Sequence, residues 1–216
     1  GLRALNSWRL QAADSAFTQA LQLDSTFALA YYRRSLGRGW LNWVDTASAT
    51  DADRAVQYAN RLPIRQQEIV RGHAELSGAF RNVVRDDVNG ARQQFLASRE
   101  RLARLVASDS LDAEAWYAFA DAAYHLVWNT DYARNPDSTA KYLNQSMRAF
   151  QRTIALDSTF HLAFRHLVEI YNQAAVPRSY AVLVGDSIKP GGPTNYEARL
   201  GTASQMTAMR TAASVR

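Results

Sequence analysis

Residues 23–31 read LDSTFALAY, and residues 156–164 repeat this pattern almost unchanged as LDSTFHLAF. A third stretch, residues 108–116, reads SDSLDAEAW and keeps an acid, a hydroxyl residue, a short gap, and then an alanine followed by a large aromatic residue. Self-similarity of this kind is typical of stacked helical units. We therefore expect an array of helices, and such arrays usually bind other molecules rather than catalyse reactions.

The composition indicates a globular domain. The chain has 216 residues, of which 47% are apolar and 21% are charged, so it can bury a sizeable core as one domain or one short array. Arg, Asp or Gln interrupts every apolar stretch well before the roughly 18 to 20 residues that would cross a bilayer. We expect a soluble domain, in the cytoplasm or in a periplasmic or extracellular space. Because the chain begins at Gly1 and not at Met, we expect a processed chain or part of a longer protein.

Cysteine is absent from the sequence, which excludes disulfides, thiolate metal sites and cysteine nucleophiles. The net charge of +5 is carried by 23 Arg and 2 Lys, which are interleaved with acidic residues. A run of Arg92, Arg99, Arg101 and Arg104 could contact a polyanion, but Glu100 dilutes it and no aromatic residues alternate with it to stack on bases. The sequence therefore does not favour a nucleic-acid partner.

Helical periodicity dominates the chain, and strand-like alternation is nearly missing. A helix is expected to stop at Leu62-Pro63, because proline lacks an amide proton, and the segment 39–50 is expected to be a loop or a poorly periodic extension. The acid and hydroxyl residues of the repeated stretch are typical of helix starts, so they predict a helix beginning near Thr26. The expected helices cover residues 2–10, 13–23, 26–37, 51–61, 64–80, 87–107, 112–128, 138–156 and 159–174.

The character of the chain changes after Ala174, where Pro177, Gly185 and the run 190–193 (PGGP) are crowded together. We therefore divide the chain into a helical repeat domain, 1–174, and a C-terminal linker or wrap, 175–216. Residues 180–184 could form a short strand, and a closing helix could cover residues 194–212.

The alternation of small and large residues resembles that of tetratricopeptide repeats. Ala13, Phe17 and Ala20 follow the second helix of such a repeat, and the pairs Ala30-Tyr31 and Ala163-Phe164 follow the first. The shared alanines lie 85 and 48 residues apart, which are not multiples of the family's repeat of about 34 residues, so some repeats carry insertions. The resemblance implies an all-α fold: a right-handed superhelical array of antiparallel helix pairs, an α-solenoid, continued by an irregular segment that contains Pro and Gly.

In proteins of this resemblance the first helix of each pair lines a concave face, which implies a partner-binding groove. The alternative for each groove residue is an ordinary solvated helix face. The implied groove consists of Tyr32, Arg33, Tyr117, Asp121, Tyr124, Arg165, His166, Glu169 and Asn172.

The four histidines do not predict a metal site. His161 and His166 are five residues apart, which turns them to different sides of a helix, and His73 and His125 stand alone in the sequence. Partly buried or capping histidines are the simpler interpretation, with His125 beside Tyr124 the hardest to dismiss. No dinucleotide loop, phosphate loop or nucleophile elbow is present, so we expect no cofactor and no enzyme activity.

The resulting functional hypothesis is a scaffold or adaptor that holds a protein or peptide partner, a neighbouring domain or a subunit of a complex. Two alternatives remain open. The segment Leu62-Pro63-Ile64-Arg65 between degenerate repeats resembles repeat regions of bacterial multidomain signalling proteins, which implies a ligand-sensing regulatory domain. The chain could also be a structural subunit whose C-terminal segment wraps a neighbour.

Overall fold

The computed structural model describes residues 1–109, 111–128, 136–175, 181–184 and 187–190, and this part of the chain is almost entirely helical. The all-α prediction is therefore confirmed. Across these residues, no helix combines the length and the hydrophobicity needed to cross a membrane. The helices are α1 (Leu2–Asn6), α2 (Leu10–Leu23), α3 (Ala28–Leu41), α4 (Thr46–Gln57), the short 3₁₀ turn η1 (Ala59–Arg61), α5 (Ile64–Val84), α6 (Val88–Ser108), α7 (Ala113–Trp128), α8 (Pro136–Leu156) and α9 (His161–Ala175).

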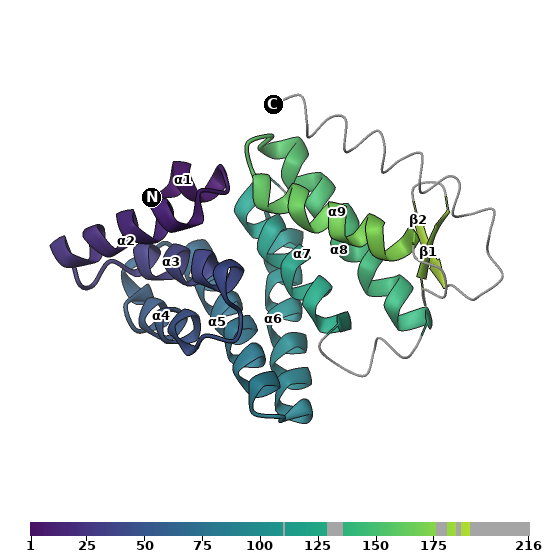
Figure 1. Cartoon of the computed structure of the whole chain (residues 1–216), viewed down its shortest axis with the longest axis horizontal. Helices are drawn as coiled ribbons and strands as arrows, with labels where there is room; N and C mark the ends of the chain where they lie inside the picture. The colour runs from purple at the N-terminus through teal and green to yellow at the C-terminus, as the bar shows by residue number, and fades with distance from the viewer. Residues whose placement is uncertain (110, 129–135, 176–180, 185–186, 191–216) are drawn as a thin grey trace.

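The helices follow one another along the molecule in chain order, from α1 and α2 at one end to α8 and α9 (Figure 1). Each helix from α1 to α9 packs against the next one in the sequence. In addition, α1 contacts α3, α3 contacts α5, and α5 contacts α7. Helices α1, α3, α5 and α7 therefore lie next to one another in this order. Of these, α3, α5 and α7 line a common cavity.

The repeated stretch forms the same turn in both places. The Asp24 carboxylate accepts hydrogen bonds from the backbone N–H and the hydroxyl of Thr26, both at 2.8 Å, and Asp157 accepts the same two bonds from Thr159 at 2.9 and 2.7 Å. Because each carboxylate is used by this turn, the helices begin two residues beyond the threonines, at Ala28 and His161. The residues predicted to mark a helix start therefore recur before both helices, but at α3 they form a turn and not a cap, since the N-cap residue is Phe27 and its side chain makes no capping hydrogen bond. The predicted start near Thr26 is two residues early.

The segment 39–50 is more helical than the sequence predicted. Helix α3 continues through Leu41, and α4 already begins at Thr46, where the Asp45 side chain accepts a hydrogen bond from the N–H of Ala47 at 2.9 Å. The Ser48 hydroxyl donates to the carbonyl oxygen of Ser35 at 2.9 Å and is buried. Packing of the small polar side chains at the start of α4 against α3 therefore makes this segment helical, although its sequence shows little helical periodicity.

Small side chains allow the helices of a pair to approach closely. The Ser98 hydroxyl on α6 donates to the carbonyl oxygen of Gly72 on α5 at 2.8 Å, and the Ser146 hydroxyl on α8 donates to that of Ala120 on α7 at 2.9 Å. Both serines are fully buried. The same device thus closes the α5–α6 and the α7–α8 pairs.

After α9 the described chain forms a small antiparallel hairpin, β1 (Ala181–Val184) with β2 (Ser187–Pro190). The side-chain amide of Asn144 on α8 both donates to the carbonyl and accepts from the N–H of Ile188, whose side chain is buried in the core. The strand proposed at 180–184 is therefore present over Ala181–Val184. The closing helix expected at 194–212 lies outside the described residues.

Candidate functional site

A cavity of about 620 Å³ opens between α3, the start of α4, α5, α7 and α9. Its walls are largely aromatic and aliphatic, with Trp40 and Trp43 on one side and Phe80 on another. The Trp43 and Phe80 rings lie 5.9 Å apart between their centroids. The polar lining includes a group of carboxylates and imidazoles from α7 and α9, namely Asp121, His125, His166 and Glu169. Other polar residues of the lining come from the start of α4 and from α5, among them His73 and Arg81.

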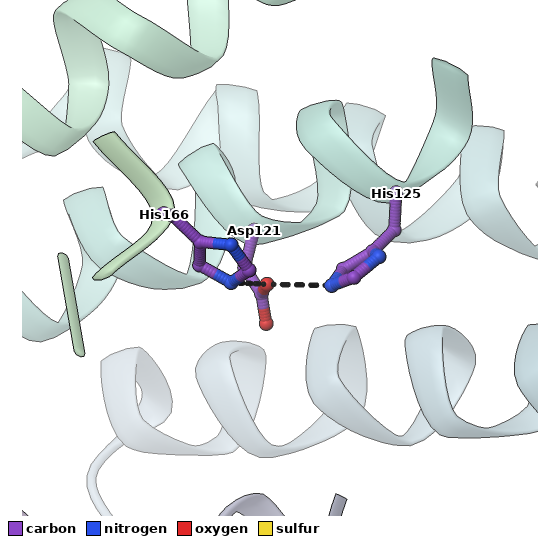
Figure 2. Close-up of side chains that lie close together, drawn as sticks. All are labelled: Asp121, His125 and His166. Carbon is purple, nitrogen blue, oxygen red and sulfur yellow. Dashed lines mark ion pairs between the residues drawn. The ribbon is translucent and has the colours of Figure 1, made fainter. Parts of the chain in front are cut away.

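The two histidines converge on one carboxylate oxygen (Figure 2). Nε2 of His166, on α9, lies 2.9 Å from Oδ1 of Asp121, and Nε2 of His125, one turn along α7 from Asp121, lies 3.2 Å from the same atom. The Asp121 and His166 side chains are buried, whereas the His125 side chain is 23% exposed. The cluster is therefore anchored in the core and can be reached from the cavity through His125.

The His166 ring is held on its other side as well. Its Nδ1 lies 3.0 Å from Oε2 of Glu169, three residues further along α9. The ring centroids of Trp40 and Phe150 lie 4.4 and 4.9 Å from that of the imidazole. The orientation of the imidazole is therefore fixed by packing and by a carboxylate.

Burial and ion pairing act on this cluster in opposite directions. Burial alone would raise the pKa of Asp121, but His125 and His166 outweigh it and hold that pKa well below its usual range. Burial would lower the pKa of His166, but Asp121 and Glu169 outweigh it and raise that pKa. For Glu169 burial is again the largest single influence, and its partner His166 nevertheless lowers the pKa. The cluster thus favours charged carboxylates facing the imidazoles.

One contact of the cluster is short but poorly aligned. Oδ1 of Asp121 and Nε2 of His166 are both buried, and among the described residues neither has a hydrogen bond of normal geometry, although the two atoms are 2.9 Å apart. The ring N–H direction therefore does not point along the line between them. Two polar atoms in a buried place normally share a well-aligned proton, so this pair departs from the usual arrangement.

A serine–histidine pair lies beside the cavity, which His73 lines, but it does not form a nucleophile. Nε2 of His73 lies 2.8 Å from Oγ of Ser35, and the Ser35 hydroxyl donates to the carbonyl oxygen of Ser48 at 2.7 Å. Since the hydroxyl proton is already used, Nε2 of His73 must be the donor in the pair. Burial lowers the pKa of His73 to about 4, only partly opposed by the Asp121 charge, so this imidazole is neutral at physiological pH. The pair is a structural link between α3 and α5.

The predicted groove residues divide into four groups. Tyr32 and Tyr117 are 1% exposed, inside the helical array, and Tyr117 accepts a hydrogen bond from Nε1 of Trp40 at 3.1 Å. Arg33 pairs with Glu114 at 3.3 Å. The cavity-lining group is Asp121, Tyr124, His166 and Glu169.

The fourth group, Arg165 and Asn172, also lies on α9. Arg165 is 58% exposed, sits over the Trp8 ring at 5.7 Å and lies 3.5 Å from Glu169. Asn172 is half-buried on the same helix. Contact of any of these residues with a partner stays a prediction.

The sequence did not single out the cavity walls. Trp40 and Trp43 lie in the segment expected to be a loop or a poorly periodic extension. His73 and His125 were expected to be partly buried or capping histidines, with His125 the hardest to dismiss. A signal for His125 was present, because Asp121 precedes it by four residues and therefore shares its face of the helix. Nothing in the sequence could place His166 beside them, since that requires the packing of α9 against α7.

No protein-family model, no curated protein and no solved structure matches the chain. The residues of the cavity and the helices that carry them are therefore the basis for a proposed function.

Proposed function

We propose that this chain is a right-handed superhelical array of antiparallel helix pairs, similar to tetratricopeptide repeats, and that it acts by binding. The contacts of α1 with α3, of α3 with α5 and of α5 with α7 support this arrangement. So do the identical turns at Asp24 and Asp157 and the buried alanines Ala30 and Ala163, which serve as spacers between helices. A preformed array loses little conformational entropy when a ligand docks.

The ligand that the cavity suits best is a small molecule, so we propose a ligand-sensing domain. The observation that supports this function most strongly is the cavity volume of about 620 Å³. Sites for small molecules typically occupy about 300–1,000 Å³, with apolar and aromatic walls and a few convergent polar groups. Here Trp43 and Phe80 supply walls, and Asp121 with its two histidines supplies the polar groups.

A thermal-shift screen against a panel of metabolites tests this proposal. A true ligand raises the melting temperature in proportion to the logarithm of its concentration. Trp43→Ala should reduce the shift, because Trp43 is a wall of the cavity, and its 50% exposure should leave the fold intact. Leu23→Ala is the matched control, since Leu23 is 91% exposed and lies outside the cavity lining.

Two results would contradict the small-molecule site. One is a panel in which no compound stabilises the chain at millimolar concentration. The other is a stabilising compound whose shift is the same in Trp43→Ala as in the wild type.

The second candidate is a peptide or protein partner, and the rim of the cavity favours it. Trp43, Val44 and Val84 line the cavity and are 50%, 47% and 49% exposed. Aromatic and aliphatic side chains at such a rim are typical of protein interfaces. In a selection from a peptide display library, Val44→Asp should abolish capture of selected peptides. Equal capture by Val44→Asp and by the wild type would remove this candidate.

A further inference from the structure

The cluster at the base of the cavity has the donor set and the spacing of a metal site. One carboxylate oxygen and two imidazole nitrogens, from Asp121, His125 and His166, lie within 4.8 Å of one another. A tetrahedral zinc ion about 2.0–2.1 Å from each ligand atom keeps those atoms about 3.3 Å apart. The two separations from the Asp121 oxygen, 2.9 and 3.2 Å, are close to this value.

Glu169 determines which atom His166 offers to the cluster. When Nδ1 of His166 carries its proton toward Oε2 of Glu169, at 3.0 Å, Nε2 is left with a lone pair. In this tautomer the lone pair lies 2.9 Å from a carboxylate oxygen, and the two buried acceptors repel each other unless a cation, either a proton or a metal ion, lies between them. Their poor alignment places that cation away from the straight line joining them, which suits a metal ion better than a shared proton.

We propose that Asp121, His125 and His166 bind a divalent transition-metal ion, for which Zn²⁺ is the best-matched species, and that Glu169 orients His166 for it. Two imidazoles and one carboxylate form a donor set used by zinc and by other first-row ions. A carboxylate on the second ring nitrogen of a ligating histidine is the usual support of such sites. To bring all three ligand atoms to tetrahedral spacing, the ring of His125 has to move. This ring is partly exposed and can turn toward the ion, while the packed His166 ring stays in place.

Three protein ligands leave a coordination position for water or for an oxygen atom of a molecule in the cavity. The proposal uses the same cavity as the proposed small-molecule site but rests only on the cluster itself. Metal binding and ligand binding can therefore be scored separately. A chain that binds zinc but none of the screened metabolites upholds the metal site alone, and the converse upholds the ligand site alone.

The test is a titration of the whole, chelator-treated chain with Zn²⁺ by calorimetry and with Co²⁺ by visible absorption. We expect one ion per chain, and intense Co²⁺ bands that report a coordination number below six. At about 100 times its dissociation constant, zinc should raise the melting temperature by about 5–10 °C. His125→Gln should abolish measurable binding, and Glu169→Gln should weaken it about 10–100-fold.

His73→Gln is the matched control, because His73 lines the same cavity but lies outside the cluster. It should bind zinc like the wild type. His125 is the preferred ligand variant, since its partial exposure makes misfolding a small risk, and circular dichroism verifies the fold. The proposal is overturned if Co²⁺ keeps the weak spectrum of its aqueous ion, if His125→Gln binds zinc as tightly as the wild type, or if His73→Gln loses as much affinity as His125→Gln.

Discussion

Arg34 and Asp51 form a two-point ion pair between α3 and α4. Nε of Arg34 donates to Oδ2 of Asp51 at 2.8 Å, and Nη2 donates to Oδ1 at 2.6 Å. A second arginine, Arg38, reaches the same carboxylate at 3.0 Å, and the Asp51 side chain is 5% exposed. One nearly buried carboxylate thus balances two guanidinium groups, and its removal leaves both without this partner.

Asp51→Ala should therefore lower the free energy of unfolding by about 2–4 kcal/mol, because breaking a buried ion pair leaves uncompensated charge. Urea denaturation followed by circular dichroism measures the change. Asp53→Ala is the control on the same helix, since Asp53 is 58% exposed in its single-point pair with Arg81 and should contribute less than about 1 kcal/mol. Similar losses for the two variants would contradict the importance of burial.

Gly72 lies at a place where α5 and α6 pack closely. A methyl group added at Gly72 would lie 2.7 Å from Cγ of Leu102, and Leu102 is 1% exposed, so it has little room to move. Overpacking outweighs the gain in helix propensity, and Gly72→Ala should lose about 1–2 kcal/mol of stability. Gly37→Ala should instead gain up to about 1 kcal/mol, since its nearest neighbour would be 3.5 Å away. Thermal denaturation of both variants tests the opposite signs.

His73 should make the stability of the chain depend on pH. Burial lowers its pKa from 6.5 to about 4, so between these values the unfolded chain binds a proton that the folded chain does not. The free energy of unfolding therefore rises with pH across this window and falls by roughly 3 kcal/mol as the pH drops from 6.5 to 4. His73→Gln, whose amide can still donate to Ser35, should flatten this part of the curve. Carboxylates titrate in the wild type and in the variant alike, so the test is the difference in unfolding free energy between the two proteins. If this difference is the same at pH 4 and at pH 6.5, the prediction is wrong.

The two interhelical serine bonds should contribute independently. Ser98→Ala and Ser146→Ala each remove a buried hydroxyl that donates across a helix pair, at an expected cost of about 0.5–1.5 kcal/mol. Because the two bonds belong to different helix pairs, the double variant should lose the sum of the single losses to within about 0.5 kcal/mol. Chemical denaturation of the three variants measures this, and a larger deviation would show that the pairs are coupled.

The sequence predicted what depends on neighbouring residues. The acid and hydroxyl residues at Asp24 and Asp157 marked the two helix starts because they are close neighbours in the sequence. The resemblance to tetratricopeptide repeats implied Asp121, His166 and Glu169 as groove residues, and these three side chains line the cavity. Their contact with a partner stays a prediction.

The parts that were not predicted depend on packing between distant segments. Trp40 and Trp43 lie in a segment with weak periodicity, and only the fit of Ser48 against α3 shows that most of it is helical. The meeting of His125 with His166 joins residues 41 positions apart on α7 and α9. This contact depends on how α9 lies against α7, and the sequence of neither helix alone shows it.

The position of the Asp121 oxygen between imidazoles on α7 and α9 has a mechanical consequence. An ion at this point would crosslink α7 and α9, which are otherwise joined through α8, and it would fix the angle between the two helices. Binding of one ion would thus alter the overall shape of the chain by changing the angle between the helices on either side of the site. Small-angle scattering of the chelated and zinc-loaded chain would detect this as a change in the radius of gyration, absent from His125→Gln.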